Sequence, residues 1–159
     1  MSTAILHRML IKTHHMTSRK KIGVITRAAK THDCSVLLKV GAPPGIMLCE
    51  GEENGVKEWE NVVRKLRYKD MRLVKRESIE KMSLGPLGVE TGDVQEIEEI
   101  KDFAKLLEGD EGLYQWWRVG MGNSQNSHSQ PGHGRRQHRR GIDAYPQASQ
   151  ILKRSINQG

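Results

Sequence analysis

The sequence predicts an α+β domain, on the evidence of hydrophobic periodicity and of the order of the segments that carry it. Across residues 5–80, four segments with alternating apolar and polar residues are interleaved with two whose apolar residues recur at helical spacing. The order strand, helix, strand, strand, helix, strand favours a four-stranded antiparallel sheet with both helices on one face, the ferredoxin-like arrangement. We expect a third helix and a disordered tail to follow this core.

Alternation and capping residues assign each element of the core. In the first strand Met9 and Ile11 point to one face, and Arg8 and Lys12 point to the other. Thr17 or Ser18 can cap the helix that follows. The predicted elements are a strand at residues 5–16, a helix at 19–32, strands at 34–40 and 46–49 joined by a Gly/Pro turn, a helix capped by Asn54 at 54–66, and a strand at 71–79.

The remaining residues form an acidic extension and a polar tail. The extension begins with a Gly/Pro-interrupted loop and continues with a predicted helix at 96–108 and an apolar segment at 113–119. After it, Gln, Ser, Asn, His, Gly and Arg dominate, and such a composition cannot bury enough surface to offset its ordering entropy. The predicted boundaries are a domain at 1–122, with its core at 5–80 and its extension at 82–122, and a disordered tail at 123–159.

Composition excludes several classes of protein. No apolar run approaches the roughly 18 residues that a membrane span needs, and the amino terminus lacks the features of a secretory signal. The two cysteines, Cys34 and Cys49, are too few for a disulfide scaffold and lack metal-ligand spacing. We therefore expect no membrane association, no metal or other cofactor, and a location in the nucleus or cytoplasm.

The sequence contains no convincing catalytic motif. His14 and His15 are adjacent, and neighbouring residues of a strand point to opposite faces, so we expect one of them in or near the core. Cys49 has no assigned histidine partner and is better explained as a buried structural thiol. The glycines at 41–45 lack the Gly-Lys-Ser/Thr ending of a phosphate-binding loop. We expect no enzymatic activity and no small-molecule substrate.

Basic residues follow the face of the predicted sheet that the helices leave open. A basic sheet face suits a polyanion, although an ordinary solvated face also carries Lys and Arg. The two central strands contain none of the aromatic residues on which RNA-recognition sheets stack bases, so duplex RNA fits better than a sequence-specific single strand. The candidate residues on this face are Arg8, Lys12, His14, Lys39, Arg72, Lys75 and Arg76.

The pair Trp116 and Trp117 stands out in a chain with 4% aromatic residues. One explanation is that an indole docks the segment on the core. The other is that the pair anchors a protein partner, since tryptophan is enriched among the residues that dominate interfaces. We retain both residues as candidate partner-binding residues.

Several motifs, in the right order, resemble one family: the C-terminal domain of the spliceosomal pre-mRNA-processing factor three, which also follows an RWD domain in small RWD-domain-containing proteins. The match covers residues 5–121. It is carried by Leu10-Ile11-Lys12-Thr13-His14-His15, Arg19-Lys20-Lys21-Ile22, Pro44-Gly45-Ile46-Met47-Leu48-Cys49-Glu50-Gly51, Trp59, Leu66-Arg67, Lys75-Arg76-Glu77 and Leu113-Tyr114.

This resemblance implies a ferredoxin-like fold and a non-enzymatic, splicing-related module that binds paired small nuclear RNA. The matching polar positions are His14, His15, Lys20, Lys21, Arg67 and Arg76. Neither a long charged region nor an RWD domain precedes residue 1, so we expect a stand-alone version or a fragment. The third helix and the Leu-Tyr segment favour the RWD-associated branch of the family. The alternative to RNA binding is therefore that the chain is a protein-interaction module of this branch and binds no RNA.

Overall fold

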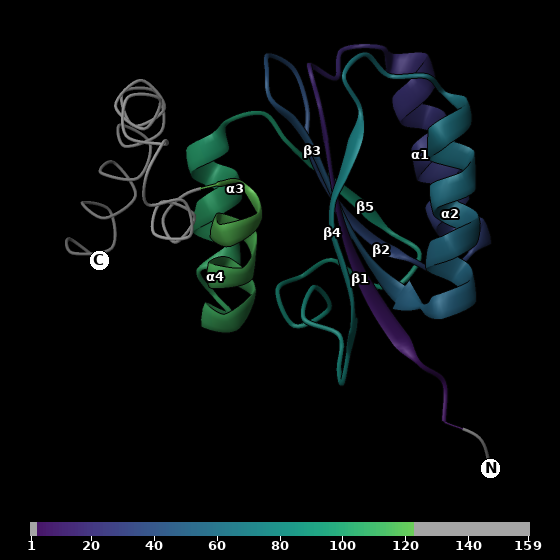
Figure 1. Ribbon diagram of the computed structural model, residues 1–159, viewed down its shortest axis with the longest axis vertical. Helices are drawn as coiled ribbons and strands as arrows, with labels where there is room; N and C mark the ends of the chain where they lie inside the picture. The colour runs from purple at the N-terminus through teal and green to yellow at the C-terminus, as the bar shows by residue number, and fades with distance from the viewer. Residues whose placement is uncertain (1–2, 123–159) are drawn as a thin grey trace, which may run out of the picture. The chain divides into compact units, whose positions relative to one another are not determined.

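The computed structural model describes residues 3–122 (Figure 1). The elements in chain order are β1 (Leu6–Thr13), α1 (Arg19–Thr31), β2 (Ser35–Lys39), β3 (Gly45–Glu52), α2 (Glu53–Lys65), β4 (Arg72–Ile79), β5 (Val94–Ile97), α3 (Ile100–Leu107) and α4 (Glu111–Gly120). The α+β fold and the predicted order of the first six elements are confirmed. Contact clustering divides the chain into one compact unit that ends at Phe103 and a second that begins at Ala104.

The first unit is a mixed sheet with the strand order β4-β1-β3-β2-β5, and α1 and α2 lie together on one of its faces (Figure 1). β1 pairs antiparallel with both β3 and β4, and β2 pairs antiparallel with β3. In the register of these pairs, Leu10 of β1 lies opposite Leu48 of β3, which lies opposite Leu37 of β2.

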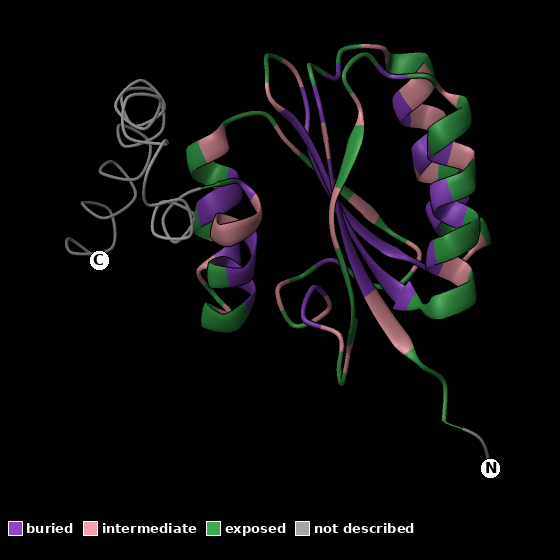
Figure 2. Cartoon of the chain, in the orientation of Figure 1, coloured by how far each residue is buried: buried purple, intermediate pink, exposed green. Residues whose placement is uncertain are grey.

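The main core lies between this sheet and the two helices. The inward strand positions include Met9 and Met47, and the helices contribute Ile25 and Trp59, all fully buried. Burying side chains of this size contributes about 1.5–3 kcal/mol each. In Figure 2 both helices show buried residues toward the sheet and exposed residues away from it, as the helical spacing of their apolar residues predicts.

The sheet has five strands rather than the predicted four, because the segment expected to begin the third helix starts as a strand. β5 runs parallel to β2, with the amide of Val36 donating to Asp93 O at 3.0 Å and that of Val40 donating to Ile97 O at 2.8 Å. The helix itself begins at Ile100. Pairing with β5 satisfies the backbone groups on a strand edge that would otherwise stay unpaired.

The second face of the sheet is not open, so this expectation is wrong. Leu10, Leu37 and Leu48 point away from the helices, and all three have no exposed surface. At one end of this face, the backbone amides of Ser83 and Leu84 donate to the carboxylate of Glu50, both at 2.8 Å. Alternation correctly assigned the side chains of β1 and β2 to faces, but it did not show that this face would be covered.

The second unit contains α4 and the end of α3. Asp110 caps α4 by accepting a hydrogen bond from the amide of Leu113 at 3.1 Å. The predicted disordered tail lies outside the described residues. Within residues 3–122, no helix is long and apolar enough to cross a membrane.

Candidate nucleic-acid interface

The two adjacent histidines lie side by side on the surface. β1 ends at Thr13, so the strand alternation does not extend to His14 and His15, and both are exposed. Their ring centroids are 5.1 Å apart. The expectation that one of them lies in or near the core is therefore wrong, because the backbone leaves the sheet one residue earlier than that expectation required.

The start of α1 lies directly after this pair. Ser18, one of the two predicted candidates, caps the helix by accepting from the amide of Lys21 at 3.2 Å. Arg19 donates to both carboxylate oxygens of Glu96, at 2.8 and 3.0 Å. This hydrogen-bonded pair raises the pKa of Arg19 and lowers that of Glu96. Glu96 thus offsets the charge of Arg19, whereas Lys20 is exposed and forms no ion pair within residues 3–122.

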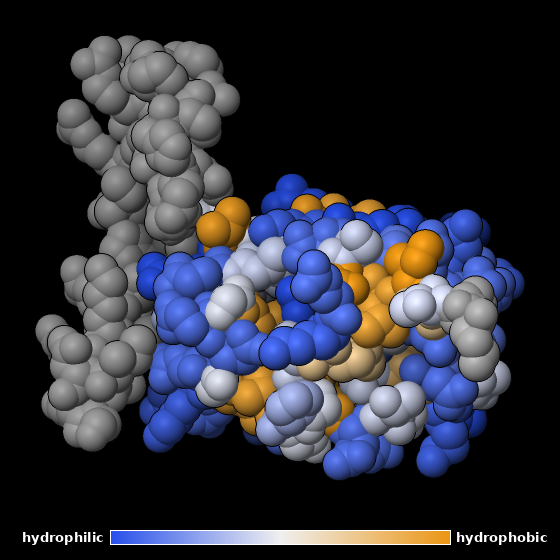
Figure 3. Space-filling model, turned by 90° about the horizontal axis from the view of Figure 1, so that it is seen from below, coloured by the Kyte–Doolittle hydropathy of each residue, from blue (hydrophilic) through white to orange (hydrophobic). Residues whose placement is uncertain are grey.

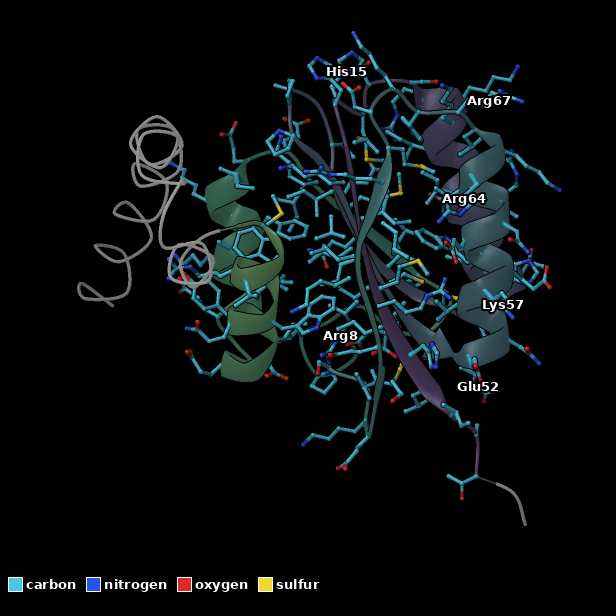
Figure 4. All side chains as sticks on the ribbon, viewed as in Figure 1. Arg8, His15, Glu52, Lys57, Arg64 and Arg67 are labelled. Atoms are coloured by element: carbon cyan, nitrogen blue, oxygen red, sulfur yellow. The ribbon has the colours of Figure 1, made fainter. Side chains whose placement is uncertain are left out.

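The segment that follows α2 completes this end of the molecule. The backbone amide of His14 donates to Lys69 O at 3.0 Å, and Nδ1 of the His14 ring lies 3.9 Å from a carboxylate oxygen of Asp70. Lys21 places its Nζ 4.8 Å from the centre of the Tyr68 ring, a cation–π contact that joins α1 to this segment. Figure 4 shows His15 and Arg67 at the same end of the molecule.

We call the cluster of His14, His15, Lys20, Lys21, Arg67 and Lys69 the basic end. Asp70 is the acidic residue in contact with it. The α1 sequence that adjoins it contains basic residues and no Asp or Glu, and the amino terminus of α1 adds its positive dipole.

Arg8, by contrast, is buried in an internal network. Its Nε donates to Glu50 at 2.8 Å and its second guanidinium nitrogen donates to the hydroxyl of Ser83 at 2.7 Å. A carboxylate oxygen of Glu77 lies 3.5 Å away. Arg8 is on the predicted face of the sheet, but it is 7% exposed and is not available to a polyanion.

Lys39 is also buried. Its ammonium donates to Ala42 O at 2.6 Å and to Val40 O at 3.3 Å, so it holds the turn between β2 and β3. Burial lowers the pKa of Lys39, and the nearby carboxylate of Glu99 opposes that shift. The prediction of Lys39 as an accessible binding residue is wrong for the same reason as for Arg8.

The other predicted basic residues of the sheet differ in exposure and in their partners. Lys12 and Lys75 are partly buried and have contacts within the protein. Arg76 lies opposite Met9 and binds Glu60 of α2, a buried carboxylate that also accepts from Arg64, so its predicted place on the open face is wrong. Arg72 is exposed at the start of β4.

Trp116 and Trp117 lie on α4 and are 9% and 2% exposed. Leu113 and Tyr114 on the same helix are buried as well. An anchor for a partner needs an accessible ring, so this burial argues against that role. Their role in partner binding stays a prediction.

Sequence reasoning missed three exposed cations near the basic end or on α1: Lys69, Arg27 and Lys30. The signal for Arg27 and Lys30 was available, because a helix with several cations and no acidic residue is unusual enough to mark the whole helix as a candidate. The importance of Lys69 depends on its backbone contact with His14, which only the folded chain shows.

Within residues 3–122, no group of three or more His, Cys, Asp or Glu side chains is arranged to hold a metal ion. Cys34 and Cys49 are free and buried. Burial raises the pKa of Cys49 well above its ordinary value, and the neighbouring Cys34 adds to the shift. A thiol held in its protonated form is a poor nucleophile.

No family model and no curated protein matches this chain. Among solved structures, the BlrP1 BLUF structure is 12% identical over 72% of this chain and 79% of its own, with a TM-score of 0.50. A bacterial light-regulated adenylyl cyclase is 16% identical with a TM-score of 0.47, and this chain spans 35% of its length. Acylphosphatase from Bacillus subtilis is 17% identical over 59% of this chain and 99% of its own, with a TM-score of 0.38. At 12% identity, the likeness to the BlrP1 BLUF structure supports the fold alone.

Proposed function

We propose that this protein is a non-enzymatic RNA-binding module whose contact surface is the basic end. The observation that carries the proposal is convergence. His14, Lys20 and Arg67 are spread over more than fifty residues of sequence, yet β1, α1 and α2 bring them to one end of the sheet. Exposed cations gathered in this way suit the phosphate backbone, which supplies most of the affinity for nucleic acid.

The proposal differs from the sequence-based one in where RNA binds. A sheet-face interface would depend on Arg8 and Lys39, and both are committed to contacts inside the protein. The basic end retains candidates from the family resemblance, notably Lys21 and Arg67. That resemblance also names the class of RNA, which is paired small nuclear RNA in pre-mRNA splicing.

The test is binding of the full chain to a short RNA duplex with a 3′ overhang. We compare wild type with Lys20→Glu/Arg67→Asn. Glutamate in the first turn of α1 favours the helix dipole, and asparagine tolerates the left-handed backbone of Arg67, where φ is 55°. The matched control is Lys57→Glu/Lys81→Asn, which makes the same change in net charge at exposed positions.

We expect the basic-end variant to bind at least tenfold more weakly and the control to bind within about twofold of wild type. Loss of two phosphate contacts should lower the slope of log affinity against log salt by about 1.5. Using the full chain leaves the tail in every sample, so its arginines affect all variants alike. Equal losses in both variants would contradict the assignment of the site, and equal affinity for a DNA duplex would contradict RNA as the ligand.

A further inference from the structure

A pocket of about 360 Å³ lies at the opposite end of the first unit, where β1 begins, α1 ends and α2 starts. Its volume is at the lower end of the range of about 300–1,000 Å³ that small-ligand sites occupy. The lining residues come from separate parts of the chain: Leu6, His32, Asp33, Glu52, Met82 and Thr91, with Gly51 and Gly55.

Two glycines let the walls of this pocket approach one another. A Cβ on Gly55 would lie 2.4 Å from the carbonyl oxygen of His32, and a Cβ on Gly51 would lie 3.3 Å from that of Asp33. Only glycine at position 55 therefore allows α2 to pack this closely against the end of α1, whereas a Cβ on Gly51 would require a shift of a few tenths of an ångström. The close approach brings backbone oxygens of residues 32 and 33 to the pocket region.

The polar groups of the pocket favour a cationic occupant. Asp33 and Glu52 are exposed carboxylates in its lining. The carboxyl end of α1 adds the negative end of a helix dipole. The start of α2 would by itself attract an anion, but Glu52 and Glu53 already place negative charge there.

The apolar part of the lining suits the stem of a long side chain. Leu6 and Met82 contribute apolar surface next to the carboxylates. Ile5, adjacent to Leu6 in the chain, is 56% exposed and is the more exposed of the two exposed large hydrophobic side chains among the described residues. Figure 3 views the molecule from this end and shows apolar surface beside hydrophilic side chains near the first residues of the chain.

We propose that this pocket binds a lysine or arginine side chain of an extended partner peptide, with a neighbouring apolar residue of the peptide resting on Ile5. Long basic side chains bury their methylene stems on apolar surface while the charged head stays near polar groups. Leu6 and Met82 contact the stem, and Asp33 and Glu52 pair with the head. The site lies at the other end of β1 from the basic end, so it goes beyond RNA binding and does not depend on it.

The experiment is a titration of the ¹⁵N-labelled full chain with the peptide acetyl-Gly-Leu-Arg-Gly-amide, followed by ¹H–¹⁵N correlation NMR. A second peptide carries citrulline, which keeps the shape of arginine without its charge. We expect saturable shifts of the amides of Leu6, Gly51, Gly55 and Thr91, and at least tenfold weaker binding of the citrulline peptide. Equal binding of the two peptides, shifts confined to the basic end, or no saturable shift would each overturn the proposal.

The variant Asp33→Asn/Glu52→Gln removes both charges with little cost to the fold. Asparagine tolerates the φ of 54° at residue 33, and Glu52 makes no side-chain capping bond to α2. Its matched control is Asp70→Asn/Glu58→Gln, because Asp70 has a φ of 56° and Glu58 is an exposed residue of α2. We expect at least a tenfold loss of arginine-peptide affinity in the first variant and less than a twofold change in the control.

A second variant guards against an indirect effect of the charge changes. Thr91 is an exposed residue of the pocket lining, so Thr91→Trp should fill the pocket from its rim without disturbing the core. We expect it to abolish binding of the arginine peptide while its spectrum elsewhere stays that of wild type. Undiminished binding to Thr91→Trp would show that the peptide uses another surface.

Discussion

Replacing Glu50 with glutamine should destabilise the fold more than any substitution of an exposed residue, because it removes the buried carboxylate that pairs with the buried charge of Arg8. Glu50 has no exposed surface and accepts from Arg8 at 2.8 Å and from the amides of Ser83 and Leu84 at 2.8 Å each. Glutamine keeps an oxygen for the two amides, so the main loss is the ion pair.

Breaking a buried pair on one side costs about 3–5 kcal/mol. Glu77, 3.5 Å from Arg8, retains part of the attraction, so we expect a loss near 3 kcal/mol. Urea unfolding followed by tryptophan fluorescence measures it. With a denaturant dependence near 2 kcal/mol/M, the midpoint should fall by about 1.5 M.

The double variant Arg8→Met/Glu50→Gln separates charge from hydrogen bonding. It removes the guanidinium while the glutamine oxygen still accepts from the two amides. We expect it to recover about 2 kcal/mol relative to Glu50→Gln, because the stranded charge is gone. A loss below about 0.5 kcal/mol in Glu50→Gln, the range of ordinary surface changes, or no recovery in the double variant would refute the reasoning.

Three further predictions concern other elements. Burial raises the pKa of Tyr68 to about 12, from 10.0, so between these pH values ionisation of the phenol favours the unfolded chain. When the pH is raised to about 12, the free energy of unfolding measured in urea should therefore fall by about 2 kcal/mol more in wild type than in Tyr68→Phe. Alanine at Gly55 would place its Cβ 2.4 Å from a backbone oxygen, but at Gly23 only 3.5 Å from a side chain; thermal unfolding should show about 2 kcal/mol destabilisation at Gly55 and up to 1 kcal/mol stabilisation at Gly23, and equal effects would contradict the packing. The hydrogen bond from Arg19 lowers the pKa of Glu96. The contribution of this pair to stability is therefore present above the ordinary carboxyl pKa and is lost as the pH falls through the lowered pKa. The difference in melting temperature between wild type and Glu96→Gln should vanish in acid, and a difference that grows in acid would contradict the pairing.

Much of the first unit follows from local patterns. Ser18, one of two predicted candidates, caps α1, and the alternation in β1 correctly separates Arg8 from Met9. These features depend on neighbouring backbone geometry and therefore leave a trace in the sequence. The parallel strand β5 leaves almost none, because four residues can fit either period, and Ile97 and Ile100 also lie at helical spacing.

The candidate site was less predictable than the fold. Lys20 and Arg67 were named from the sequence, through a family resemblance, and both are exposed at the basic end. The role of Lys69 and the proximity of His14 to His15 were not foreseen. Both depend on where β1 leaves the sheet and on a contact across more than fifty residues.

The sequence by itself determined the order of the first six elements, the faces to which the residues of β1 and β2 point and the concentration of positive charge on α1. These are local properties, set by the period of the backbone and the residue types along it. Only the tertiary structure decided which face is accessible. Covering a face depends on contacts such as those of Ser83 and Leu84 with Glu50, 33 and 34 residues away. No local period encodes such contacts, and they moved the proposed RNA surface from the sheet face to the basic end.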